Sequence, residues 1–151
     1  MAPIKRHKAL HPLSREHHHT LLLGWKIKKG IHKGIAPERI KKYADWYFIN
    51  HLLPHFEEEE ISFGKILDAN DTGLLQMQQE HNLIKETFNK KTDEQTLIEI
   101  AGLLEKHVRF EERDLFNRVQ AIATEQQLED LYAAENADEK FRDNEEDTFW
   151  I

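Results

Sequence analysis

The sequence predicts an all-α protein, an up-down-up-down four-helix bundle with an additional short C-terminal helix. The chain has 151 residues but only six glycines and four prolines, and these residues separate long segments with helical periodicity. Within the segments, apolar residues recur at steps of three and four, the spacing that gives a helix one apolar face. Four long helices joined by short connections favour an antiparallel bundle.

Proline and glycine bound the first two helices. The first helix is expected to begin near Pro12 and to end at Gly30 or Gly34, because glycine favours the position just past a helix C-terminus. Pro37 suits the first turn of the second helix, where the missing backbone N–H is not needed. Further along that helix, Pro54 predicts a kink, because an interior proline removes one backbone hydrogen bond.

Turn signals separate the later helices. The turn NDTG introduces a third helix over about 72–90. KTDE, with Thr92 or Asp93 as the N-cap, introduces a fourth helix over about 94–118. A shorter fifth helix is expected after Ala123, and the acidic tail DNEEDTFWI is expected to be loosely held. We expect one domain over residues 1–151, with the bundle core at about 10–118 and the C-terminal helix and acidic tail at about 124–151.

Composition limits the possible functions. The chain has no cysteine, which excludes thiolate nucleophiles, iron–sulfur clusters and Cys-based zinc sites, so a metal would be bound by histidine and carboxylate. A formal net charge of −7 argues against a nucleic-acid partner. No apolar run approaches the ~20 residues of a membrane span, and none resembles a signal peptide. We therefore expect a cytoplasmic protein without membrane contact.

Two segments repeat one spacing, since HFEEE at 55–59 and HVRFE at 107–111 each place a histidine four residues before a glutamate. Side chains four apart lie on one helix face, with Cβ atoms roughly 5–6 Å apart, so such a pair can hold one cation. A weak surface pair is the alternative for either copy alone. All four long helices contribute, because the third supplies His81 and the first supplies His17, His18 or His19.

Apolar neighbours at helical spacing place these polar residues toward the core. His107 is spaced with Leu104, and His81 with Met77 and Ile84. Burying an unpaired carboxylate or imidazolium costs several kcal/mol even after the protein relaxes. A cluster of four histidines and two glutamates therefore calls for a bound cation.

Four segments, LSREHHHTLLL, LPHFEEEE, QEHNL and KHVRFEERDLF, resemble the hemerythrin-like family, also called the HHE cation-binding domain, in order, spacing and flanking residues. The resemblance covers roughly residues 10–118. It implies a four-helix bundle around a non-haem diiron centre. Carried over by position, it makes Glu59 and Glu111 the carboxylates that bridge the irons and His55, His81 and His107 terminal ligands.

The resemblance leaves two candidates for the ligand from the first helix. His18, with Leu21 three residues later, fits the family's E-x-H-x-x-L context. His17 directly follows Glu16, an acid–histidine pairing like that before His81. His18 is the favoured candidate.

The third helix departs from the family's oxygen carriers, which have two histidines four residues apart there. The positions four before and four after His81 are Met77 and Lys85. The missing ligand would be replaced by Glu58, His51 or water. An additional open position favours chemistry or sensing over reversible storage of oxygen, because exchangeable sites admit substrates.

The leading hypothesis is a non-haem diiron protein that binds dioxygen, another small diatomic molecule or peroxide, in oxygen, iron or redox sensing or handling. We expect an apolar pocket formed by Trp25, Phe48, Phe88 and Phe110. The second hypothesis is a diiron enzyme of the peroxidase, oxidase or nitric oxide reductase type. The third is a helical interaction module with a structural zinc. Zinc and manganese remain alternatives to iron, because divalent affinities overlap. The sequence leaves the oligomeric state open.

Overall fold

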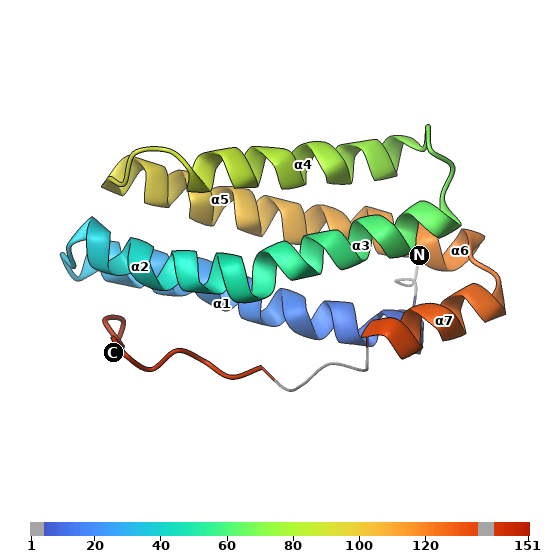
Figure 1. The fold of residues 1–151 in the computed structure, drawn as a ribbon, viewed down its shortest axis with the longest axis horizontal. Helices are drawn as coiled ribbons and strands as arrows, with labels where there is room; N and C mark the ends of the chain where they lie inside the picture. The colour runs from blue at the N-terminus through green and yellow to red at the C-terminus, as the bar shows by residue number, and fades with distance from the viewer. Residues whose placement is uncertain (1–4, 136–140) are drawn as a thin grey trace.

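The computed structural model describes residues 5–135 and 141–151, and all regular secondary structure in these ranges is helical (Figure 1). The predicted all-α class is therefore confirmed. The α-helices are α1 (His11–His32), α2 (Pro37–Tyr47), α3 (Leu53–Ile66), α4 (Thr72–Phe88), α5 (Glu94–Phe110), α6 (Phe116–Ile122) and α7 (Glu125–Glu135). A 3₁₀ turn at Lys8–Leu10 precedes α1.

Two of the predicted long helices contain a wide π-helical turn. Phe48–Leu52 joins α2 to α3, and Glu111–Leu115 joins α5 to α6. In the first of these turns the Leu53 N–H donates to the carbonyl of Phe48, five residues back. The kink expected at Pro54 thus takes the form of an extra residue in the preceding turn. One extra residue rotates all later side chains by about 100° around the helix, and such turns are frequent at functional sites.

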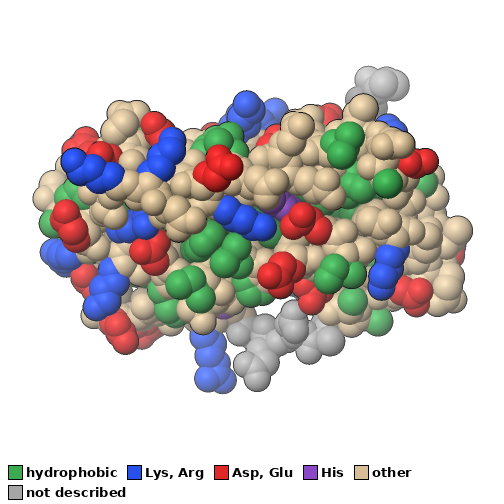
Figure 2. Space-filling model, turned by 45° about the horizontal axis from the view of Figure 1, so that its top comes forward, with side chains coloured by type: hydrophobic (Ala, Val, Ile, Leu, Met, Phe, Trp, Pro, Cys, Tyr) green, Lys and Arg blue, Asp and Glu red, His purple; other side chains and the backbone are tan. Residues whose placement is uncertain are grey.

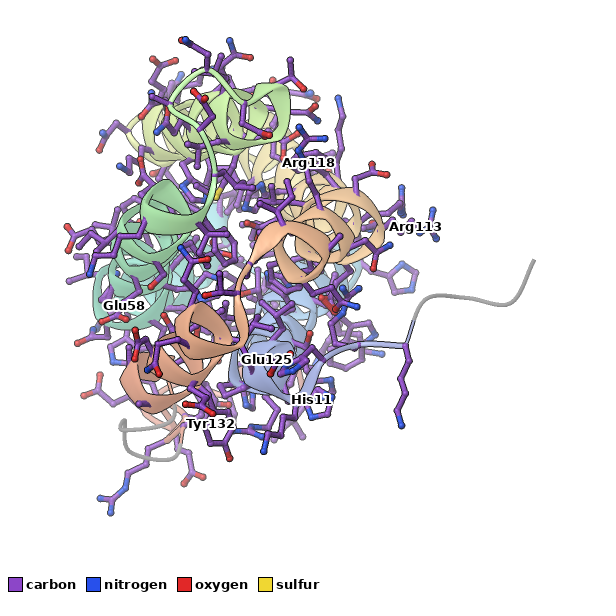
Figure 3. All side chains as sticks on the ribbon, turned by 90° about the vertical axis from the view of Figure 1, so that its right-hand side faces the viewer. His11, Glu58, Arg113, Arg118, Glu125 and Tyr132 are labelled. Atoms are coloured by element: carbon purple, nitrogen blue, oxygen red, sulfur yellow. The ribbon has the colours of Figure 1, made fainter. Side chains whose placement is uncertain are left out.

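The long helices lie side by side along the molecule (Figure 1). Helix α5 packs against both α1 and α4, while α3 packs against α4. Helix α7 crosses one end, next to α1 and α3, as the end-on view of Figure 3 shows. None of the described helices is long and apolar enough to cross a membrane.

The apolar core has two parts. One cluster lies among α1, α2, α3, α4 and α5 and includes Phe56 and Leu104. The other includes Leu13, Phe63 and Phe116, toward the end that α7 covers. Each part contributes one aromatic ring that stacks on a buried histidine. Phe56 stacks on His81, and Phe116 stacks on His17 of α1. The polar cluster is therefore enclosed by apolar side chains from both parts of the core.

The expectation of a loosely held tail was wrong. The Asp143 carboxylate accepts hydrogen bonds from the Lys26 ammonium, at 2.6 Å, and from the Tyr43 hydroxyl. Phe149 is only 3% exposed and packs so closely on Gly30 that a Cβ there would lie 2.7 Å from its ring. The tail is acidic in composition, but Phe149 and Trp150 pack on the apolar core formed with α1 and α2, and the acidic groups Asp143 and Asp147 contact the basic partners Lys26 and Arg39.

Replacement of Phe149 by alanine is expected to lower the free energy of unfolding by ~3–5 kcal/mol, the usual range for a buried Phe→Ala change. The loss combines the removed apolar contacts with the cavity left beside Gly30. Urea denaturation followed by circular dichroism measures it. Ile151→Ala is the matched control, because Ile151 is 82% exposed. Equal stability of the two variants would show that the tail contributes nothing to folding.

Candidate metal centre

The two His-x3-Glu pairs lie inside the protein. His55 Nε2 is 3.2 Å from a carboxylate oxygen of Glu59, and His107 Nε2 is 3.1 Å from one of Glu111. Glu111 is the first residue of the second π turn. Both glutamates are fully buried, and each histidine is at least nine-tenths buried. On the face of the molecule that Figure 2 draws, little histidine is visible among interspersed acidic and basic side chains.

The other two helices complete the cluster. His17 Nε2 from α1 lies 2.8 Å from Glu111 Oε1, and His81 Nε2 from α4 lies 3.4 Å from Glu59 Oε1. Their ligating atoms fall into two groups whose members all lie within 4.8 Å of one another. The groups are His17, His55, Glu59 and Glu111, and Glu59, His81, His107 and Glu111. Both glutamates belong to both groups, which is the arrangement of two neighbouring cation positions that share two carboxylates.

Several polar atoms of the cluster lack hydrogen-bond partners within the described ranges. These atoms are both carboxylate oxygens of Glu59, Oε2 of Glu111, Nε2 of His55, His81 and His107, and Nδ1 of His17 and His81. An unpaired buried polar atom is costly, and native proteins contain few of them. The carboxylate oxygens and the Nε2 atoms carry lone pairs that can point at a cation, so the residues present fit a metal. Nitrogen and oxygen donors without thiolate suit iron, manganese or zinc.

The electrostatics of the cluster strongly couple its acids and bases. Burial by itself lowers the pKa of His107, but the neighbouring Glu111 and Glu80 carboxylates raise it to about 10. Burial likewise opposes protonation of His55, yet Glu59 and Glu16 raise its pKa well above the ordinary value. These interactions outweigh the burial effect because the opposite charges are within hydrogen-bonding distance. The buried carboxylates therefore favour the protonated form of His55 and His107.

His17, rather than His18, belongs to the cluster, which corrects the preference for His18. His17 is 3% exposed and stacks on Phe116 with ring centroids 5.1 Å apart. His18 is exposed, because consecutive residues of a helix point about 100° apart. The acid–histidine pairing with Glu16 was the informative signal, and the E-x-H-x-x-L context was misleading.

Of the proposed substitutes for the second histidine of the third helix, the two residues, His51 and Glu58, do not belong to the groups. His51 contacts the rings of Trp46 and Phe141 instead. Glu58 lines a cavity outside the cluster. Met77 is buried in the apolar core. Within the part of the chain that the structure describes, each group therefore has four protein donors.

The aromatic surroundings differ from the pocket expected from the sequence. Trp25 is 50% exposed. Phe48 stacks on Phe88, with ring centroids 4.2 Å apart, in the apolar cluster that also contains Phe56. Phe56 and Phe116, which sequence reasoning missed, supply the rings against the histidines. Phe56 directly follows His55, so the sequence shows that it is next to a candidate ligand. The sequence does not show that its ring points toward His81.

A second set of glutamates contacts the outer side of the histidines. Glu80 Oε1 lies 2.6 Å from Nδ1 of His107, and a Glu16 oxygen is hydrogen-bonded to Nδ1 of His55. Sequence reasoning noted Glu16 and Glu80 as neighbours of histidines but did not predict these contacts. The signal was present, because each glutamate directly precedes a histidine of the cluster.

A cavity of about 1180 Å³ lies beside this cluster. Its wall includes His55 and Glu16 at the cluster side, Tyr47 and Glu58 from α2 and α3, and Glu135 from α7. Burial, together with the nearby Glu58 carboxylate, raises the pKa of Glu135 to about 9. The cavity is large enough for an organic molecule and reaches a candidate ligand directly.

Comparisons of the chain with models of protein families, with curated proteins and with solved structures find no match. The function of this cluster is therefore inferred from the geometry of its residues.

Proposed function

We propose that the protein is a non-haem diiron protein of the hemerythrin-like type, with its long helices forming an up-down-up-down four-helix bundle. The observation that best supports the proposal is a pair of buried four-residue groups that could each hold a metal ion and that share Glu59 and Glu111. Four separated helices supply these donors, and the shared carboxylates suit two adjacent cations. The order of the segments and their spacing give independent support from the sequence.

In this proposal the six residues have distinct roles. Glu59 and Glu111 would bind both ions, His17 and His55 would bind one, and His81 and His107 would bind the other. A bound pair of iron ions would supply one-electron chemistry toward dioxygen and related molecules. The buried rings of Phe56 and Phe116 exclude bulk water from the histidines they stack on.

Four protein donors per group leave room for a small exogenous ligand, because iron commonly accepts further ligands and open positions allow exchange. The proposed ligand is dioxygen, another small diatomic molecule or peroxide, and the proposed role is oxygen, iron or redox sensing or handling. His17 and His107 each place a nitrogen beside the same oxygen of Glu111, and so hold that carboxylate in one orientation.

Metal analysis with an absorption spectrum tests the proposal. About two irons per chain are expected, with a near-ultraviolet band that bleaches on reduction and returns in air. The same measurement on protein reloaded with zinc is the control, because zinc has no such transition. Protein that binds no metal would overturn the diiron proposal. Protein that retains only zinc under aerobic loading with iron would also overturn it and leave a helical module with structural zinc.

His17→Ala is expected to reduce the bound metal to about one ion per chain or less, whereas His18→Ala should leave two. His17 supplies a donor to one group, and His18 lies on the surface. The two neighbouring residues make a matched pair, since both changes remove an imidazole from α1. Metal analysis after gel filtration gives the comparison, and equal loss in both variants would contradict the assignment of His17.

The cavity favours a second candidate function, a diiron enzyme of the peroxidase, oxidase or nitric oxide reductase type. A site for diatomic ligands alone does not need about 1180 Å³ of space beside His55. Turnover of peroxide, of nitric oxide or of an organic reductant by the iron-loaded protein tests this candidate. Asn50→Trp, which enlarges an exposed side chain of the cavity wall and changes none of the six donors, should impair turnover of organic molecules while leaving two irons bound.

A further inference from the structure

The four histidines of the cluster all use their two ring nitrogens in the same way. Each Nε2 faces Glu59 or Glu111. Each Nδ1 faces a different, more peripheral carboxylate. We call these carboxylates the outer ring, and its members are Glu16, Glu60, Glu80 and Glu112.

The contacts of the outer ring are of two kinds. His55 and His107 are hydrogen-bonded through Nδ1 to Glu16 and Glu80. The remaining two contacts are longer, with Glu112 Oε2 3.4 Å from Nδ1 of His17 and Glu60 Oε2 3.4 Å from Nδ1 of His81. Glu112 is itself held by the Ser14 hydroxyl, which donates at 2.8 Å.

The outer ring closes on itself around the cluster. Glu16 of α1 reaches the histidine of α3, and Glu60 of α3 reaches that of α4. Glu80 of α4 reaches the histidine of α5, and Glu112, in the π turn that follows α5, returns to α1. Every outer-ring residue is also next in sequence to a cluster residue. Each helix therefore places a carboxylate beside the histidine of the next, and hydrogen bonds orient two of the four imidazoles, those of His55 and His107.

The outer ring changes the charge that the site presents to a metal. Two carboxylates and four neutral imidazoles give the cluster a charge of −2, and four outer carboxylates bring the total to −6. Two divalent ions leave this sum negative, whereas two trivalent ions balance it. Glu80 has only 17% of its side chain exposed, and Glu60 and Glu112 about a third, so solvent screens them incompletely.

We propose that the outer ring selects metals that reach the trivalent state and holds the bound pair in that state. The proposal rests on the proposed function, and it adds a reason for the preference for iron over zinc and the direction of the shift in the iron potential. A carboxylate that accepts a hydrogen bond from a metal-bound imidazole raises the basicity of that ligand. Both this effect and the added negative charge stabilise iron(III) more than iron(II). Zinc, which stays divalent, gains less from the same charges.

Glu80→Gln separates the effect of the negative charge from that of the hydrogen bond. Glutamine is neutral, but its side-chain oxygen can still accept the hydrogen bond from His107 Nδ1. Glu57→Gln is the matched control, since it removes the same charge from an exposed position two residues after His55. The midpoint potential of the iron-loaded protein, measured by spectroelectrochemistry, is expected to rise in Glu80→Gln and to remain unchanged in Glu57→Gln. The dissociation constant for iron(III) should rise ~10–100-fold in Glu80→Gln, with a smaller rise for zinc.

The outcomes separate the two proposals. Wild-type protein without iron would overturn both. Wild-type protein with two irons, but with equal potentials in Glu80→Gln and Glu57→Gln, would overturn the outer ring alone. Equal weakening of iron and zinc in Glu80→Gln would do so too, because it would reveal a structural role without charge selection. Glu16→Gln repeats the test on His55 at a more exposed position, 43% exposed, where a folding defect is less of a risk.

Discussion

Glu111→Ala is expected to abolish binding of both metal ions, with dissociation constants raised by at least about 100-fold, beyond the usual effect of an outer-shell change. Glu111 belongs to both candidate groups, so its loss removes one donor from each ion and also the partner of His17 and His107. Metal analysis after exhaustive dialysis measures the loss.

The control for this prediction is Glu57→Ala, which removes an exposed glutamate from the neighbouring helix. Circular dichroism must show that both variants remain helical. Glu111→Ala could fold well without metal, because it removes a buried carboxylate. Retention of two ions by a folded Glu111→Ala protein would contradict the assignment of a shared carboxylate.

Metal affinity is expected to rise steeply with pH, by about tenfold per pH unit for each proton released. Without metal, the neighbouring carboxylates hold the pKa values of His17, His55 and His107 above the ordinary 6.5. A metal binds only the neutral ring, so it must displace these protons. The rise should continue until the pH passes the pKa of His107, about 10. Calorimetric titrations in buffers of different ionisation enthalpy count the protons released, and a pH-independent affinity would contradict the prediction.

The stability of the metal-free protein should change in the opposite direction. A histidine whose pKa is raised on folding contributes stability that is complete below pH 6.5 and is lost as the pH rises through its folded pKa. His107 therefore stabilises the metal-free protein less and less between pH 6.5 and about 10. Burial and the nearby Glu58 raise the pKa of Glu135, which disfavours folding over part of the same window. Urea denaturation at pH 6 and pH 9.5, with and without metal, measures the difference.

Helix boundaries were predictable because local residues determine them. Pro37 lies in the first turn of α2, and the Asp93 side chain accepts a hydrogen bond from the Thr96 N–H at the start of α5. The π turns were not predictable, because an extra residue in one turn leaves the apolar spacing almost unchanged. Only Pro54 indicated that the second long helix is irregular.

The cluster was predictable in outline because the i,i+4 rule fixes which face a pair such as His107 and Glu111 shares. The choice between His17 and His18 depended on the rotation of α1 in the bundle, which no local rule supplies. The tail shows the same limit, because charge alone did not reveal that Phe149 is buried against Gly30. In both cases tertiary packing decided what composition left open.

The two candidate cation positions are nearly equivalent, because they share both carboxylates. Each group has two imidazoles and the same pair of glutamates, and each half of the site has a Glu-His pair on one helix and a His-x3-Glu pair on another. The donor set therefore has approximate two-fold symmetry, so the protein donors alone would not distinguish two bound ions. The cavity breaks this symmetry, because it touches His55 and none of the other three cluster histidines. An incoming molecule would consequently meet the ion of His17 and His55 first, so a difference between two chemically matched metals would arise from access alone.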